Sequence, residues 1–233
     1  TARTMLSRPG CVVSAVSGVA ALAVSDALGW PVEVLPNGID PVPWRHAHPV
    51  PRVAGRLRVV TVARLAPRKR IPELIRALAR ARVLLESDVH LDATVIGDGP
   101  LRTRIERLAR GLDIDIRFTG RLDADAIRAV FGRSDAFVQA SVRESFGIAA
   151  LEARTFGLPV IARSQSGTSE FIHDGFEGLL APDDRRLADA IVHLGRDQRL
   201  GERIATHNVE VEPRETWPIV CGEASRLYAV AGA

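Results

Sequence analysis

Two glutamates within the stretch 143–152 have the spacing that is most informative about chemistry. Glu144 and Ser145 lie in a loop after a predicted strand, and Gly147 is predicted to open a helix. Free backbone N–H groups at such a helix start point toward any anion held there. Glu152 falls in the second turn of the helix, so two carboxylates would be available to paired hydroxyls, as in a sugar or ribose. The alternative is that Glu144 only complements the helix dipole and that Glu152 is an ordinary surface charge.

A cluster of cations follows the first strand of the predicted sheet. The loop 64–70 contains Lys69, the only lysine among 31 basic residues, together with several arginines. Guanidinium groups bind a diphosphate in forks, and an ammonium adds a compact point charge. A solvated basic turn is the alternative. The single lysine in an arginine background favours phosphate binding by this loop.

Two other loops combine glycine with small residues. The segment 97–100 begins like a dinucleotide fingerprint, but Arg102 replaces the third glycine, so it is a weak NAD signature. Its glycines fit a tight turn beside a ligand, and they equally fit a turn with no other role. The segment 165–170 suits a loop that closes over a ligand and also suits any surface loop.

Composition excludes several classes of protein. A hydrophobic fraction of 46% and a charged fraction of 25% are typical of a globular chain with a real core. The formal charge of +3 is too small for binding nucleic acid by charge alone, so no nucleic-acid partner is expected. The two cysteines and six histidines lack metal-ligand spacing, and no nucleophile elbow is present. No apolar run reaches the ~20 residues that span a bilayer.

Alternating apolar patterns predict a doubly wound α/β domain with a parallel, Rossmann-like sheet. Short apolar runs predict five strands, at 57–63, 91–96, 116–118, 136–139 and 159–162. Helical spacing predicts helices near 71–78, 101–112, 124–131, 147–156 and 187–194. Right-handed crossovers cover both faces of such a sheet, and ligands bind beyond the carboxyl ends of its strands. The loops described above all follow predicted strands and should therefore meet at this edge.

The first fifty residues are organised differently. Short strands are predicted at 11–14 and 32–35, with a helix between them. Much later in the sequence, a turn is predicted at 174–178. The segment 40–53 contains four prolines, which cannot continue a helix or a central strand. It is therefore a predicted linker and a candidate domain boundary.

Together these residues resemble glycosyltransferase family 4, the retaining, nucleotide-sugar-dependent transferases with the GT-B fold. The matching segments run in order through the chain: 36–40, 63–65 with Lys69, 97–100, 118–120, 144–147 with Glu152 and Ala153, 157–160, and Gly167 with Glu170. The ordered set, which includes the E-x7-E pair and an arginine and lysine five apart, is specific. It covers nearly the whole chain from Val12 onward.

The resemblance implies a role for each matching residue. Arg64 and Lys69 would hold the donor diphosphate and stabilise the leaving group, and Glu144 would contact hydroxyls of the transferred sugar. These three are the predicted catalytic residues, and Glu152 would bind the ribose hydroxyls. The remaining predicted donor-binding residues are Gly120, Arg121 and Leu122 beside the base, and Ser145, Phe146, Gly147 and Ile148 beside the sugar and phosphate. The implied donor is a UDP- or GDP-linked sugar, with no cofactor and no metal.

The resemblance also implies a division of the chain, as the C-terminal half of a GT-B fold. Residues 1–40 would be a remnant of the acceptor domain, 41–54 a linker, 55–208 the nucleotide-sugar-binding domain and 209–233 a helix that returns toward the first half. The acceptor, which is a lipid, a polysaccharide or a small molecule, would bind mainly in that first half. This chain alone is therefore expected to bind the donor and to transfer sugar poorly or not at all.

Family members imply a cytoplasmic location, with peripheral association at the inner face of the membrane and a role in cell-envelope glycans. One departure is that Ser166 stands where the family usually has glycine. Two other functions fit the same scaffold: a non-catalytic nucleotide-sugar-binding module, and a sugar-nucleotide epimerase of related fold.

Overall fold

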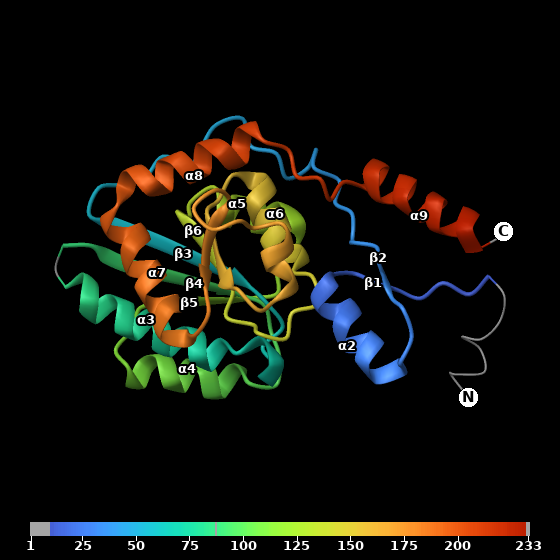
Figure 1. The fold of residues 1–233 in the computed structure, drawn as a ribbon. Coiled ribbons are helices and arrows are strands. Elements are labelled where there is room, and N and C mark those ends of the chain that lie inside the picture. Colours follow the sequence, from blue (N-terminus) through green and yellow to red (C-terminus); the bar gives the residue numbers. More distant parts are fainter. Residues whose placement is uncertain (1–9, 87, 232–233) are drawn as a thin grey trace.

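A parallel six-stranded sheet forms the centre of the computed structural model, which describes residues 10–86 and 88–231 (Figure 1). The strands lie in the order β5-β4-β3-β6-β7-β8. Their bounds are β3 Arg56–Val62, β4 His90–Ile96, β5 Ile116–Gly120, β6 Ala136–Val138, β7 Val160–Arg163 and β8 Gly178–Ala181. The carboxyl ends of all six therefore meet at one edge.

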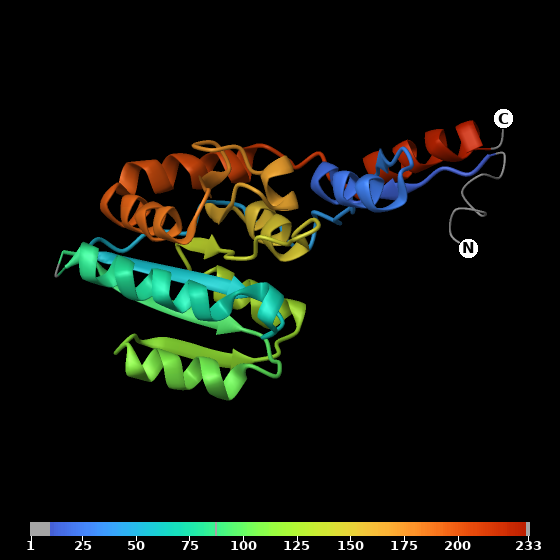
Figure 2. The ribbon, with the colours of Figure 1, turned by 60° about the horizontal axis from the view of Figure 1, so that its bottom comes forward.

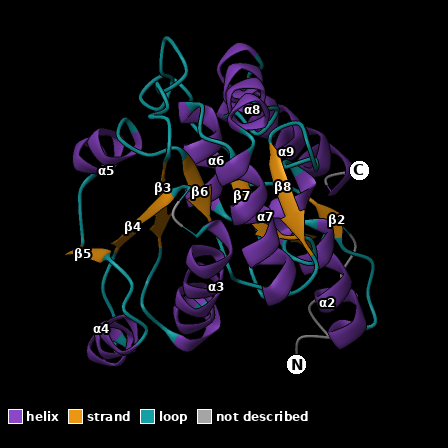
Figure 3. Ribbon diagram, turned by 90° about the vertical axis from the view of Figure 1, so that its left-hand side faces the viewer, coloured by secondary structure: helices purple, strands orange, loops and turns teal. Residues whose placement is uncertain are grey.

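Helices cover both faces of this sheet (Figure 3). One face packs on α3 (Ile71–Leu85), α4 (Arg102–Gly111) and α7 (Asp184–Arg196), and the other on α5 (Ala124–Phe131) and α6 (Ile148–Phe156). Consecutive side chains of β3 supply both cores, because Val59 packs with the first set of helices and Val60 with the second. The predicted doubly wound parallel sheet is confirmed.

The prediction of five strands was wrong, because the structure contains a sixth, β8. The segment 174–178, predicted as a turn, leads directly into this strand. A Cβ atom on Gly178 would lie 1.8 Å from the Val160 carbonyl oxygen, so β8 needs glycine where it approaches β7. Glycine is a weak strand former, and this is why the sequence pattern concealed the strand. Helix α8 (Gln198–Glu210) was not predicted either.

Most other bounds differ by one to three residues, but α3 extends seven residues beyond its predicted end at 78. Strands β1 (Ser14–Ala15) and β2 (Glu33–Val34) are shorter than predicted and form a separate parallel pair, with α2 (Gly18–Leu28) between them in sequence. Strand β6 ends before Gln139, and α6 begins at Ile148 rather than at Gly147. The short helix Gly167–Glu170 (η2) lies inside a segment that was predicted as a loop.

The chain ends beside its own first segment. Helix α9 (Trp217–Ala231) and the unit formed by β1, β2 and α2 extend from the same end of the main sheet (Figure 2). The Ile39 amide donates to the Glu215 carbonyl at 2.8 Å, and the Trp217 amide donates to the Ile39 carbonyl at 3.1 Å. Residues 41–54 contain no helix or strand. The predicted domain boundaries remain predictions, and residues 1–9, 232 and 233 lie outside the described part of the chain.

Among the described helices, we find none with the length and apolar character of a membrane-spanning segment.

Candidate functional site

A cleft of about 370 Å³ opens at the carboxyl ends of β3 and β6. The end of β3, the loop 68–71, the end of β6 and the start of α6 form most of its walls. It is lined by Val16, Asn37, Thr61, Val62, Ala63, Arg68, Lys69, Ile71, Gln139, Ala140, Ser141, Glu144, Ser145, Phe146, Gly147, Ile148 and Ala149. Ligands of doubly wound sheets bind at this edge, so the cleft is the candidate site.

An ion pair crosses the cleft between Lys69 and Glu144. The Lys69 Nζ atom lies 2.5 Å from Glu144 Oε2, and the two side chains are 19% and 13% exposed. The short helix Pro67–Lys69 (η1) positions the lysine, and it ends where Arg70 adopts a left-handed conformation with φ of +53°. The Arg70 guanidinium is held at 2.6 Å by Asp184. The cleft thus offers a cation for an anionic ligand and a carboxylate for hydroxyl groups.

The start of α6 adds backbone donors to the same cleft. Ala150 and Leu151 donate their N–H groups to the Gly147 carbonyl. The N–H groups of Ile148 and Ala149 donate to no residue in the described part of the chain. Unpartnered donors at a helix start, together with the helix dipole, favour negative charge. The predicted contact of the backbone N–H groups of residues 146–148 with a sugar and phosphate remains a prediction.

Gly147 is required by its own conformation and by its neighbours. Its φ is +101°, which side chains rarely tolerate, and a Cβ atom would lie 2.4 Å from Thr168 Oγ1. The segment η2 also braces the preceding loop, because Gly167 donates its N–H to the Glu144 carbonyl at 2.8 Å. A Cβ atom on Gly167 would lie 2.2 Å from the Ser145 carbonyl oxygen. The segment 165–170 thus fixes the loop that carries Glu144.

The glycine turn 97–100 braces the loop that carries Lys69. A Cβ atom on Gly97 would lie 1.9 Å from the Ala63 carbonyl oxygen, and a Cβ atom on Gly99 would lie 2.6 Å from the Leu65 carbonyl oxygen. The Leu65 amide donates to the Asp98 carbonyl at 2.9 Å. These glycines therefore allow two backbone segments of the protein to approach each other closely. None of the residues 97–100 lines the cleft.

Glu152 is a partly buried carboxyl group without a partner among the described residues. It lies one turn beyond Ile148 on the same face of α6, and it does not itself line the cleft. Burial raises the pKa of Glu152 to about 7, because desolvation disfavours the charged form. A carboxylate with two unused acceptor oxygens is suited to bind a pair of hydroxyls.

The cleft gathers Lys69, Glu144 and the predicted residues 145–148, but not the remaining predicted site residues. Arg64 follows Ala63, a lining residue, and is exposed without an ion pair to any described residue. Gly120 accepts a hydrogen bond from the Gly97 amide at 2.7 Å, Arg121 is exposed and Leu122 lines a different hollow. Direct contact of these residues with a ligand remains a prediction.

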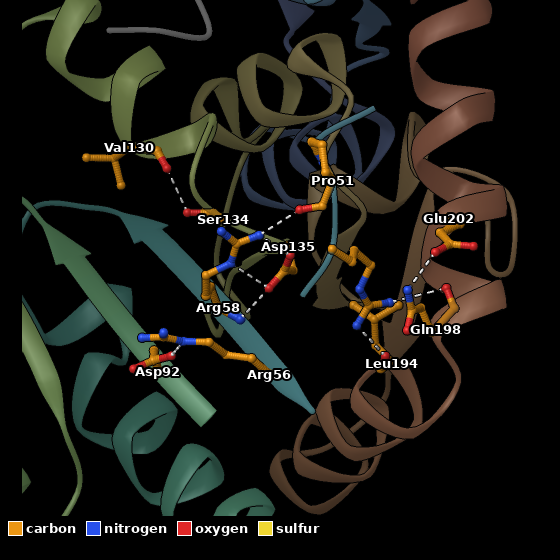
Figure 4. A network of polar contacts seen from close by, with 11 residues as sticks. Pro51, Arg56, Arg58, Asp92, Val130, Ser134, Asp135, Leu194, Gln198 and Glu202 are labelled. Atoms are coloured by element: carbon orange, nitrogen blue, oxygen red, sulfur yellow. Dashed lines mark hydrogen bonds and ion pairs between the residues drawn. The ribbon is translucent and has the colours of Figure 1, made fainter. Parts of the chain in front are cut away.

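The hollow beside Leu122 is larger, at about 840 Å³, and follows β3, β4 and β5 next to α5. Figure 4 shows the polar network near its end. Arg58 donates to both carboxylate oxygens of Asp135, at 2.7 and 3.0 Å, and to the Pro51 carbonyl at 3.0 Å. The Asp135 side chain is fully buried, so these bonds satisfy a charge that folding removes from water. The network lies at the amino ends of β3 and β6, and we assign it a structural role.

Sequence reasoning overlooked several polar residues of the cleft. Gln139, Ser141 and Asn37 line it but received no individual role, and Arg68 was counted only among the cations of its loop. A polar residue directly after a buried strand of a doubly wound sheet is the signal that would have identified Gln139. The structure places no group of three or more His, Cys, Asp or Glu side chains suited to a metal ion among the residues it describes.

Comparison with known proteins identifies relatives of this chain. A sequence model of the family described as glycosyl transferases group 1 matches residues 46–210. A phosphatidyl-myo-inositol mannosyltransferase of Mycobacterium leprae is 32% identical over 222 residues, which cover 92% of this chain and 58% of that protein. A GDP-mannose-dependent alpha-mannosyltransferase of Mycolicibacterium smegmatis is 32% identical over 182 residues, covering 76% and 44%. The chain spans about half the length of the curated relatives it matches.

Solved structures share the fold. A sucrose-phosphate synthase of Thermosynechococcus elongatus superposes with a TM-score of 0.79 at 23% identity, covering 98% of this chain and 60% of that one. An Anabaena protein in complex with UDP and glucose gives a TM-score of 0.76 at 23% identity, covering 93% and 62%. The likeness supports the predicted GT-B type of fold at the level of architecture.

Proposed function

The chain belongs to the glycosyl transferases group 1 family, and on that premise we propose that its cleft binds the donor, a nucleoside diphosphate sugar. One observation carries the proposal. The Lys69–Glu144 ion pair lies in the same cleft as the unpartnered N–H groups of Ile148 and Ala149. An anion and a hydroxyl-bearing group joined to it would find their partners side by side.

The cationic side of the cleft is suited to the diphosphate. The Lys69 ammonium and the start of α6 attract negative charge, and the exposed Arg64 follows directly after the cleft wall. Negative charge grows on the diphosphate as its bond to the sugar breaks. The groups that bind the diphosphate therefore also stabilise the transition state.

The acidic side is suited to hydroxyl groups. In this proposal Glu144 accepts hydrogen bonds from the transferred sugar, and Glu152 accepts them from the ribose. Glu152 needs such a ligand more than most surface glutamates, because it is partly desolvated and has no partner among the residues that the structure describes. Residues 120–122 would border the base, as the resemblance implies.

Transfer with retention of configuration and without a metal is part of the proposal for the whole protein. Several relatives are named as GDP-mannose-dependent mannosyltransferases, and the Anabaena neighbour was solved with UDP, so GDP- and UDP-linked sugars are the donors to test first. The name of the Mycobacterium leprae relative contains phosphatidyl-myo-inositol. This name supports the proposal of a lipid acceptor. It also supports the proposal that the whole protein acts in the cytoplasm, at the inner face of the membrane.

A thermal-shift panel of UDP, GDP and ADP with their sugars tests donor binding. A ligand at ~100 times its dissociation constant adds about 2.7 kcal/mol of stability, which raises the melting temperature by several degrees. We expect one nucleotide series to stabilise the wild type and to leave Lys69→Met unshifted. If no nucleotide shifts the wild type, the cleft is not a donor site.

Retention and catalysis need a separate measurement. The whole protein, including the acceptor domain, with the identified donor and a lipid or glycan acceptor, should give a product whose anomeric configuration matches that of the donor, as read by NMR. An inverted product would contradict the proposed mechanism. A changed sugar nucleotide in the absence of acceptor would indicate an epimerase instead.

A further inference from the structure

Gln139 is a buried glutamine at the carboxyl end of β6, in the wall of the cleft. Its residue is only 7% exposed, and its backbone amide donates to the Ile161 carbonyl at 2.8 Å. Its carboxamide lies beside the start of α6, since a Cβ atom on Gly147 would be 3.5 Å from both the Nε2 and the Oε1 atom. The strand and the helix start thus hold a polar group in the wall of the cleft that also contains the Lys69–Glu144 pair.

A chain of hydrogen bonds determines which way the carboxamide faces. The Thr168 hydroxyl is fully buried and donates its single proton to the Phe146 carbonyl at 3.2 Å. Its oxygen must then act as acceptor toward Gln139, at 3.1 Å, which assigns the Nε2 donor to that side. The Oε1 acceptor is left without a partner in the described part of the chain.

The Oε1 atom is not one of the fully buried polar atoms that lack a partner among the described residues, so it is open to the cleft and not sealed in the core. Because Gln139 lines the cleft, a bound ligand is the partner that Oε1 can reach. An amide oxygen only accepts hydrogen bonds, so it repels an ionised diphosphate, which has no proton to donate. It suits a hydroxyl or an N–H group, and in a nucleoside diphosphate sugar these abound on the sugar.

We propose that Gln139 contacts the transferred sugar, with its Oε1 atom accepting a hydrogen bond from a sugar hydroxyl or N–H group, and that Thr168 is a positioning residue that orients the carboxamide. This inference rests on the proposed donor site and deepens it. Glu144 and Gln139 line the same cleft, so both can contact the sugar of one bound donor.

The structural alternative is that Gln139 and Thr168 only tie β6 to η2. The two interpretations differ in one measurable quantity, the ratio of the dissociation constant of the nucleoside diphosphate to that of the matching nucleotide sugar. A purely structural contact changes both constants together. A sugar contact changes only the constant of the nucleotide sugar.

The experiment is calorimetric titration of wild type and variants with both ligands, using the nucleotide series that stabilises the wild type. Gln139→Met keeps the length of the side chain and removes the acceptor. We expect it to weaken nucleotide-sugar binding about tenfold, and to leave binding of the nucleoside diphosphate within about twofold.

Thr168 provides a matched pair of variants. Thr168→Val removes the hydroxyl at nearly constant volume and should lose most of the sugar-dependent part of the affinity. Thr168→Ser keeps the hydroxyl and should retain the wild-type ratio. This pair decides the question even if Gln139→Met does not fold.

Two outcomes would overturn the inference while leaving the donor site intact. One is an unchanged ratio in Gln139→Met and Thr168→Val, which would leave Gln139 a structural residue. The other is an equal loss for both ligands, which would place the contact on the nucleotide. A wild type that binds no nucleotide would instead remove the donor site itself, and this inference with it.

Discussion

At the scale of single residues, charges that are partly removed from water set the properties of the site. Lys69 and Glu144 compensate each other across the cleft, whereas Glu152 has no described partner and has its pKa raised to about 7 by burial. A ligand that supplies hydroxyl donors to Glu152 would favour the charged form and lower that pKa. The same burial that costs stability therefore prepares this residue for binding.

The first prediction concerns Glu152→Gln. The folded protein binds the Glu152 proton more tightly than the unfolded chain, whose glutamate has the ordinary pKa of 4.5. The contribution of Glu152 to the free energy of unfolding is thus most favourable at low pH and falls as the pH rises from 4.5 to 7. Glu152→Gln should stabilise the protein by about 2 kcal/mol at pH 8 and by much less at pH 5, measured by urea unfolding. An equal effect at both pH values would show that burial does not perturb this carboxyl.

The same residue makes donor binding depend on pH. If the ribose hydroxyls donate to the Glu152 carboxylate, the affinity for a nucleoside diphosphate should rise between pH 6 and pH 8, and binding should release protons. Calorimetry in buffers of different ionisation enthalpy measures that release. In Glu152→Gln the affinity should be lower, and the rise of affinity between pH 6 and pH 8 should be absent. If the affinity of the variant depended on pH as that of the wild type does, Glu152 would be excluded from the site.

Lys69 tests whether the site needs an ammonium rather than any cation. Lys69→Arg keeps the charge but replaces a compact group with a wide planar fork beside Glu144. We expect at least a tenfold loss of nucleotide affinity by calorimetry. The matched control is Arg68→Lys, an exposed neighbour in the same cleft wall, which should change the affinity by less than about threefold. Equal behaviour of the two variants would mean that only the net charge of the loop matters.

At the scale of elements, the site depends on how closely loops pack against one another. The turn 97–100 braces the Lys69 loop, and η2 braces the Glu144 loop, in each case through a glycine that lies against backbone. Gly147 lies where α6, η2 and Gln139 meet, with Thr168 on one side. These contacts position the backbone donors of α6 toward the cleft.

Gly147→Ala should therefore be much more destabilising than an ordinary glycine substitution. The new Cβ would meet Thr168 Oγ1 at 2.4 Å in addition to the strain of a positive φ. Gly175→Ala is the control, because Gly175 has a φ of +81° but open space around it. We expect a loss of about 1 kcal/mol for the control and about 3 kcal/mol for Gly147→Ala, measured by chemical unfolding. Equal losses would mean that η2 moves aside freely.

At the scale of the whole molecule, one parallel sheet brings to a single edge loops that lie far apart in sequence. Strands such as β3 and helices such as α5 were predictable, because their apolar periods are regular and their ends carry turn residues. Strand β8 was not, since it begins with a glycine required by the backbone of β7. The charges at the site could be found from their types and spacing. The position of Gln139 directly after a buried strand could be found in the same way, but its role could not, because only the fold reveals an oxygen without a described partner.

The whole-molecule proposal also predicts independence from metal ions. Donor binding relies on Lys69 and on the start of α6 to offset the diphosphate charge, so EDTA should change nucleotide affinity by less than about twofold, measured by calorimetry. At matched ionic strength, added magnesium should also change the nucleotide affinity by less than about twofold. A loss of tenfold or more with EDTA, restored by magnesium, would contradict the metal-free site.

A crystal structure of the protein with the nucleoside diphosphate that stabilises it tests the central claim most directly. We predict that the phosphate oxygens lie within hydrogen-bonding distance of Lys69 Nζ and of the Ile148 and Ala149 amides, with the ribose hydroxyls on Glu152. A diphosphate bound in the hollow beside Leu122, or anywhere away from Lys69 and the start of α6, would contradict the account.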